Sequence, residues 1–152
     1  MILNVVICIA TFFFMEFVAW FTHKYIMHGF LWILHKDHHD RSKKKIFENN
    51  DLFFLIFAIP GSLFIVVGSQ LGFDCFLFWI GLGITIYGAA YFFVHDLFIH
   101  QRIKLLKKTK NTYLTGIRKG HKVHHKHLGK EDGECFGMLL VPLKYFKFSS
   151  KK

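Results

Sequence analysis

The sequence predicts an all-α integral membrane protein with three transmembrane helices, a fourth left open, and cytoplasmic helical extensions that carry histidines. Hydrophobic residues make up 53% of the 152 residues, which exceeds the roughly 45–50% that is usual in soluble domains. All 20 Lys and Arg residues fall within 22–51 and 101–152. A Lys or Arg at the centre of a bilayer costs about 3 kcal/mol, so a membrane explains this separation. The composition therefore excludes a soluble nucleic-acid-binding protein, a disordered chain and a disulfide scaffold.

The predicted spans follow from length and hydropathy, because a helix needs about 20 apolar residues to cross the hydrocarbon core. Three stretches meet this condition, at about 1–21, 52–70 and 75–94. The first contains one charged residue, Glu16. Gly72, Phe73 and Asp74 separate the other two, which predicts a tight helical hairpin. The segment Cys135–Pro142 is too short to span, and the sequence leaves open whether it re-enters the membrane or lies on it.

The distribution of positive charge predicts the orientation. Residues 22–51 carry six Lys and Arg and residues 101–130 carry ten more, whereas the turn at 71–74 carries none. The first group includes a run of four, Arg41, Lys43, Lys44 and Lys45. Cytoplasmic loops are enriched in these residues, so we expect the segments 22–51 and 95–152 in the cytoplasm. This predicts a protein of the cell (inner) membrane.

Ten of the 11 histidines fall into two copies of one spacing pattern. The first copy is His23-x4-His28 followed by His35-x2-His38-His39, and the second is His95-x4-His100 followed by His121-x2-His124-His125. Each copy follows an apolar span on the side predicted to be cytoplasmic. A single histidine is more often a core or surface residue than a ligand, but chance would not place two matching sets at the same membrane face.

The spacing indicates how the imidazoles point. Positions i, i+3 and i+4 share one helix face, so His35, His38 and His39 are expected to aim at one place, and the corresponding set in the second copy likewise. His23 and His28 would lie about 140° apart on an ideal α-helix. Either such a pair straddles two metal ions, or the helix ends or bulges between its members. Ten imidazoles suit two transition-metal ions with about five nitrogens each, and imidazole binds Zn, Cu, Fe and Ni alike.

Two acidic residues near these histidines are candidates for orienting them. Glu16 lies two helical turns before His23, and Asp96 follows His95 directly. Ligand histidines commonly donate their second N–H to a carboxylate. The alternatives are a protonated Glu16 that is hydrogen-bonded within the bundle and an interfacial charge at Asp96. His127 stands outside the pattern, and we expect it at the surface.

The histidine motifs resemble those of bacterial β-carotene hydroxylases, which belong to the membrane fatty acid hydroxylase/sterol desaturase superfamily. The resemblance rests on HKYIMHG at 23–29, HKDHH at 35–39, VHD at 94–96, HQR at 100–102, HKVHH at 121–125 and GKE at 129–131. Asn50-Asp51-Leu52 fits as well. It covers about residues 15–142. The sequence departs from the family after Phe136-Gly137, where the family has an aromatic residue followed by small residues and Pro, and this chain has MLLVP at 138–142.

The resemblance implies a single membrane hydroxylase domain over residues 1–152 that acts as a non-haem diiron monooxygenase. Such an enzyme would insert one atom of dioxygen at C3 of the β-ionone rings of a carotenoid dissolved in the membrane lipid, converting β-carotene through β-cryptoxanthin to zeaxanthin. It would use two iron ions, with the ten histidines as ligands. Its electrons would come from a ferredoxin-type or similar donor, because the sequence has no flavin or nicotinamide fingerprint.

Other functions compete with this one. A carotenoid ketolase, or a sterol or fatty-acid hydroxylase, would share the histidine outline, although the short chain and the GKE segment argue against them. A histidine-rich metal transporter would need ligands at mid-membrane, and residues 52–94 contain no His. A bis-histidine haem carrier would need pairs that face each other inside the bundle, whereas these histidines cluster in the predicted cytoplasmic segments.

Overall fold

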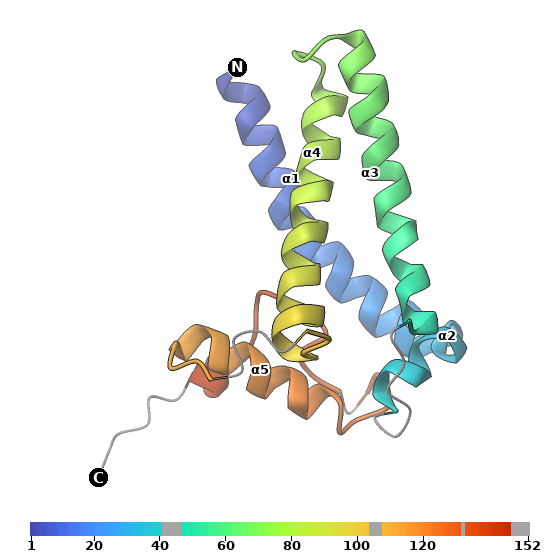
Figure 1. The fold of residues 1–152 in the computed structure, drawn as a ribbon, viewed down its shortest axis with the longest axis vertical. Coiled ribbons are helices and arrows are strands. Elements are labelled where there is room, and N and C mark those ends of the chain that lie inside the picture. The colour runs from blue at the N-terminus through green and yellow to red at the C-terminus, as the bar shows by residue number, and fades with distance from the viewer. Residues whose placement is uncertain (41–46, 104–107, 132, 147–152) are drawn as a thin grey trace.

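The computed structural model describes residues 1–40, 47–103, 108–131 and 133–146, and its described part contains helices and no strand (Figure 1). The α-helices are α1 (Ile2–Phe21), α2 (Trp32–His39), α3 (Leu52–Leu71), α4 (Phe76–Tyr91) and α5 (Thr112–His124). Two π-helices, η1 (Thr22–Phe30) and η3 (Phe92–Ile99), directly continue α1 and α4. Two 3₁₀ turns are η2 (Asn49–Asp51) and η4 (Leu143–Phe146).

Within the described residues, three helical units are long and apolar enough to cross a membrane, as the sequence predicts. They are Ile2–Phe30, Asn49–Leu71 and Phe76–Ile99. The first and third extend further than the predicted 1–21 and 75–94, because the π-helices continue them toward the polar end of the molecule. Large apolar side chains such as Phe13, Leu63 and Ile86 are exposed on their outer faces, where lipid would cover them. The chain is therefore a membrane protein.

The helices α3 and α4 form the predicted tight hairpin. Gly72 ends α3 with a φ of +108°, a left-handed conformation that suits glycine. Glycines also let the two helices approach closely. A Cβ at Gly81 would lie 2.7 Å from the carbonyl oxygen of Gly61, and a Cβ at Gly68 would overlap the backbone of Phe78. Small residues at such contacts are typical of helix packing in membranes.

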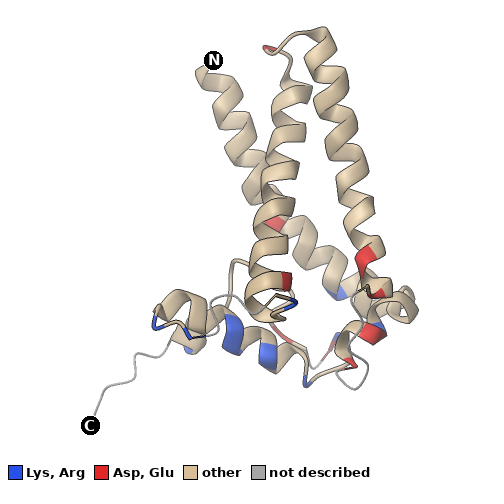
Figure 2. Cartoon of the chain, viewed as in Figure 1, with Lys and Arg blue, Asp and Glu red and all other residues tan. Residues whose placement is uncertain are grey.

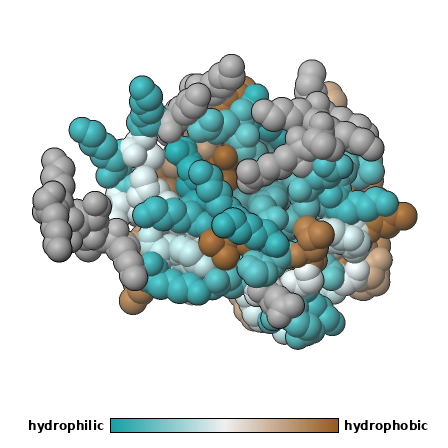
Figure 3. Space-filling view, turned by 90° about the horizontal axis from the view of Figure 1, so that it is seen from below, coloured by the Kyte–Doolittle hydropathy of each residue, from teal (hydrophilic) through white to brown (hydrophobic). Residues whose placement is uncertain are grey.

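The polar part of the molecule gathers at one end of the three spans. The helices α2 and α5 lie there, and the described Lys and Arg residues are concentrated at this end (Figure 2), as the sequence predicts. Seen from this end, the surface is mainly hydrophilic (Figure 3). Asp74 lies in the turn at the opposite end. The basic run formed by Arg41, Lys43, Lys44 and Lys45 lies outside the described residues.

The C-terminal segment 133–142, here called the strap, forms no transmembrane helix. Its described residues are irregular, and Cys135, Phe136 and Met138 are buried. Met138 is only 1% exposed and packs with Val94 and Ile117 in a small apolar core. The strap therefore packs beneath the ends of the spans, and no fourth span is present in the described part of the chain.

Candidate metal centre

The two π-helices bring together the histidines that are five residues apart. A π-helix has i→i+5 hydrogen bonds, and the backbone N–H of His100 donates to the carbonyl oxygen of His95 at 2.9 Å. The ring centroids of His23 and His28 are 5.2 Å apart, and those of His95 and His100 are 4.5 Å apart. The sequence leaves open whether each pair straddles two metal ions or whether the helix ends or bulges between its members. The structure has the bulge, which brings both members of a pair to one place.

The imidazoles form two neighbouring clusters. In each cluster the ring nitrogens that could act as ligands lie within 4.8 Å of one another. The first cluster contains His23, His28, His35, His39 and His124. The second cluster contains His38, His95, His100 and His121. His125 adjoins the second cluster, since its Nε2 lies 2.8 Å from Nε2 of His121. The structure thus brings all ten predicted histidines to one region.

The partition of histidines differs from the prediction that each HxxHH set aims at one place. His35 and His39 face the first cluster, but His38 faces the second. In the second set the middle histidine, His124, likewise joins the cluster of the other motif. The reason is angular: on an α-helix the i+4 side chain is about 40° from i, whereas i+3 is about 60° away on the other side. The prediction that the three imidazoles of each HxxHH set point to one place was therefore wrong.

The distances between ring nitrogens fit the ligand shells of metal ions. Nε2 of His23 lies 3.1 Å from Nε2 of His35, and Nε2 of His28 lies 3.1 Å from Nε2 of His124. In the second cluster, Nε2 of His100 is 2.8 Å from Nε2 of His121. Metal–imidazole bonds are about 2.1 Å long, so two ligands at right angles on one ion have nitrogens about 3 Å apart.

Two buried nitrogens point to the same conclusion for the second cluster. Nε2 of His38 and Nε2 of His95 have no hydrogen-bond partner in the described part of the chain. Their other nitrogens are held: Nδ1 of His38 lies 2.8 Å from Oε2 of Glu48, and Nδ1 of His95 lies 3.3 Å from Oδ2 of Asp96. An unsatisfied buried nitrogen costs about 1–3 kcal/mol, and a metal ion would satisfy both.

Burial also keeps these imidazoles in the state that binds metal. Burial lowers the pKa of His35 to about 3, with smaller contributions from neighbouring histidines, and lowers the pKa of His124 to about 3 for the same reasons. The pKa values of His38 and His121 are also well below the ordinary value, chiefly because of burial. At neutral pH these rings are therefore uncharged, as a metal ligand requires.

Further groups orient the rings from behind, and the sequence reasoning missed most of them. Oδ1 of Asn50 lies 2.6 Å from Nδ1 of His35. Backbone carbonyl oxygens of Phe136, Leu128 and Glu134 accept from Nδ1 of His23, His28 and His124 at 2.9, 2.9 and 3.2 Å. Asn50 belongs to the Asn50-Asp51-Leu52 motif, so the sequence could have indicated it as a group near the histidines. The carbonyl groups have no signal in the sequence, because every residue carries one.

Of the two acidic candidates, Asp96 lies beside a histidine, whereas Glu16 is hydrogen-bonded within the helix bundle, which is the alternative that the sequence left open for it. Asp96 contacts His95 and also the Nε of Arg102, at 2.9 Å. Glu16 is buried, but its described hydrogen bonds go to Tyr87 and to the strap rather than to a histidine. Seven residues of helix separate Glu16 from His23 by about 10 Å, too far for direct contact. His127 is exposed, as predicted.

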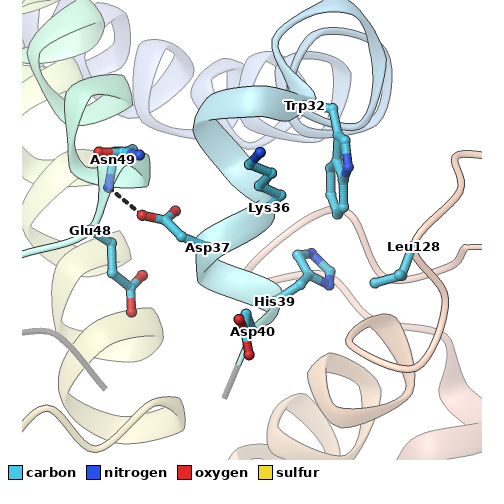
Figure 4. Close-up of a pocket in the computed structure, with 8 residues that line it drawn as sticks. All are labelled: Trp32, Lys36, Asp37, His39, Asp40, Glu48, Asn49 and Leu128. Carbon is cyan, nitrogen blue, oxygen red and sulfur yellow. Dashed lines mark hydrogen bonds between the residues drawn. The ribbon is translucent and has the colours of Figure 1, made fainter. Parts of the chain in front are cut away.

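Two cavities reach the clusters from different sides. A largely apolar one of about 600 Å³ lies among α1, α3 and α4, and His95, Asp96 and Arg102 line its polar end. A second of about 480 Å³ opens on the polar side (Figure 4). His39 and Trp32 line this second cavity. Asp37 and Asn49 also line it, and the backbone N–H of Asn49 donates a hydrogen bond to Oδ2 of Asp37 at 2.7 Å. The clusters therefore lie between an apolar cavity and a cavity that is lined mainly by polar and charged residues.

Comparison with known proteins shows the family to which the chain belongs. The family model described as fatty acid hydroxylase matches residues 8–145. A protein named beta-carotene hydroxylase from Pantoea ananas is 41% identical over 139 residues, which cover 91% of this chain and 78% of the relative. Another of that name from Paracoccus sp. (strain N81106 / MBIC 01143) is 36% identical over 91% of this chain and 85% of its own length. No solved structure matches. The chain belongs to the fatty acid hydroxylase family, and it is an oxidoreductase of the hydroxylase type.

Proposed function

We propose that this protein is a non-haem diiron monooxygenase that hydroxylates the β-ionone rings of carotenoids at C3, converting β-carotene through β-cryptoxanthin to zeaxanthin. One observation carries the proposal: two histidine clusters lie side by side at the end of an apolar cavity among the spans. The chemistry of the clusters indicates a metal-dependent oxidation. The names of the relatives favour a carotenoid as the compound that is oxidised.

The ten histidines are the proposed ligands of two iron ions. The first cluster would supply five nitrogens, and the second would supply four, with His125 beside it. Imidazole alone does not select the metal, and membership of a hydroxylase family favours iron. Two iron ions bound there would supply the redox chemistry that reduces dioxygen and oxidises a C–H bond.

The residues of the chain prepare this site in two ways. Glu48, Asn50 and Asp96 accept hydrogen bonds at Nδ1 of three imidazoles, which leaves the Nε2 lone pairs to face the metal. The apolar walls exclude water from the reacting carbon. The overall reaction balances when one oxygen atom enters the ring C–H bond as a hydroxyl. The other oxygen atom leaves as water after taking up two electrons and two protons.

The apolar cavity is the proposed site for one ring of the carotenoid. Its volume of about 600 Å³ falls within the usual range for ligand sites. Side chains such as Met15, Phe53, Phe57 and Ile84 line it, and they offer no hydrogen bonds to a hydrocarbon ring. His95 lies at the polar end, so a ring that entered from the lipid would reach the second cluster directly.

Electrons would arrive from the opposite side, from a ferredoxin-type or similar soluble donor. The cavity in Figure 4 is lined by His39 of the first cluster and by charged residues such as Lys36 and Glu48. The positive-inside rule favours the cytoplasm for the polar end of the molecule, and hence the cell (inner) membrane as the location. In this arrangement substrate and electrons use separate routes to one centre.

Accumulation of new pigments in living cells tests the proposal. The chain is expressed in bacteria that accumulate β-carotene, beside a His124→Ala variant present in equal amount in the membrane. Hydroxylated carotenoids from the wild type alone are the expected result. Unchanged β-carotene, with an iron-loaded protein in the membrane, would contradict the proposed substrate. It would favour a sterol, a fatty acyl chain or another lipid as the substrate of the same kind of site.

A further inference from the structure

Glu16 is a buried carboxylate in the C-terminal half of α1, and the proposed reaction does not use it directly. It is 6% exposed and lies on α1 among apolar residues. Acidic residues inside membrane spans are costly and are retained for a reason. Because Glu16 contacts no described histidine, its role must lie in the groups that it does contact.

Four donors converge on this carboxylate from two distant parts of the chain. Oε1 accepts hydrogen bonds from the backbone N–H groups of Met138, Leu139 and Leu140 at 2.9, 2.8 and 2.9 Å. Oε2 accepts from the hydroxyl of Tyr87 on α4 at 2.7 Å. Three successive amides around one oxygen form a backbone nest of the kind that binds anions. Glu16 thus joins α1 and α4 to the strap.

The strap is shaped to approach the carboxylate. A Cβ at Gly137 would lie 2.8 Å from Oε1 of Glu16, so only glycine fits there without displacing one of the two. Cys135, two residues earlier, has a φ of +60°, which is uncommon for a residue other than glycine. The path of the strap therefore depends on the contact with Glu16.

The same strap orients two rings of the first cluster. The carbonyl oxygen of Phe136 lies 2.9 Å from Nδ1 of His23, and that of Glu134 lies 3.2 Å from Nδ1 of His124. These two histidines come from α5 and from the π-helix that follows α1. Phe136 is two residues from the first of the amides that Glu16 binds. A displacement of the strap would therefore release both rings together.

We propose that Glu16 is a positioning residue, which anchors the strap so that the carbonyl groups of Phe136 and Glu134 hold His23 and His124 in register in the first cluster. It acts through the backbone and not as a ligand. The inference rests on the proposed function only in taking iron as the metal of the clusters; the anchoring of the strap stands on the hydrogen bonds alone.

Hydrogen exchange and iron content of the purified protein test the two steps separately. Glu16→Ala should speed exchange of the amides of residues 138–140 by about tenfold or more, since all three amides lose their hydrogen-bond acceptor. It should also weaken iron binding by about 10–100-fold, the usual cost of losing an orienting group. Glu131→Ala, which removes an exposed carboxylate, is the matched control and should change neither quantity.

Two further variants keep the proposal testable if Glu16→Ala fails to accumulate. Glu16→Gln retains an acceptor oxygen for the three amides and should preserve most of the protection and the iron. Gly137→Ala leaves the carboxylate intact but should displace the strap and reproduce both losses. The proposal would be overturned if Glu16→Ala or Gly137→Ala kept full amide protection, or if either lost that protection but kept its full iron content. It would also be overturned if Glu16→Gln lost as much amide protection and iron as Glu16→Ala. A wild type without iron would instead contradict the proposed function, while the exchange result would still test the anchor.

Discussion

His38 and His124 are the residues that tie the two histidine motifs into one centre. Each is the middle histidine of its HxxHH set, and each lies in the cluster formed mainly by the other motif. Neither cluster is therefore complete within one half of the sequence. A centre built in this way requires α2 and α5 to bring their histidine rings together, as the ring contacts of His38 with His125 and of His39 with His124 show.

Replacement of either residue should abolish turnover. His38→Ala removes a proposed ligand from the second cluster and His124→Ala removes one from the first, whereas His127→Ala changes only an exposed side chain. We expect no detectable product from the first two variants, with wild-type amounts of protein in the membrane, and nearly normal activity from the third. Full activity of His38→Ala or His124→Ala would disprove the ligand assignment. An inactive His127→Ala would mean that the site extends further.

The ten histidines could be predicted from the sequence because their spacing recurs, but their partition could not. The partition depends on how α2 and α5 lie against the two π-helices, and this tertiary packing leaves no local pattern. The same holds for the groups behind the rings. The carbonyl of Phe136 and the amides that bind Glu16 are backbone atoms, so no residue type marks them.

At the scale of elements, the π-helices are the feature on which the site depends. An α-helix would direct His23 and His28 about 140° apart, and the wider π turn brings their rings within 5.2 Å between centroids. The π-helices could not be predicted from the sequence, because the five-residue spacing of the histidines does not show which hydrogen-bond pattern the backbone adopts. π-Helical segments occur frequently at functional sites, and here one lies at the start of each motif.

The hairpin of α3 and α4 makes a prediction about stability. Gly68→Ala places a methyl group against the backbone of Phe78, so the helices must separate, at a cost of about 1–3 kcal/mol for such overpacking. Gly88→Ala, in the same hairpin, meets no atom within 4 Å and should be nearly neutral. Thermal unfolding of the purified proteins in detergent measures both. Equal stability of the two variants would show that the close approach at Gly68 is not needed.

For the whole molecule, the separation of charge predicts how the protein sits in the membrane. Phe73, in the turn between α3 and α4, is 66% exposed at one end, and Lys126 is exposed at the other. In a background without the native cysteines, we expect Phe73→Cys to react with a membrane-impermeant maleimide on spheroplasts. Lys126→Cys should react only after lysis. The reverse pattern would contradict the cytoplasmic placement of the histidine clusters.

We propose that two metal ions bind between the two motifs, one in each cluster. The most direct test is the iron content of the wild-type protein, purified from iron-supplied cells, with the His38→Ala and His124→Ala variants beside it. Ten ring ligands in two clusters predict about two iron ions per chain in the wild type, and a marked loss in each variant. A wild type with one ion or none after anaerobic loading with iron, or variants that retain both ions, would contradict a two-ion centre.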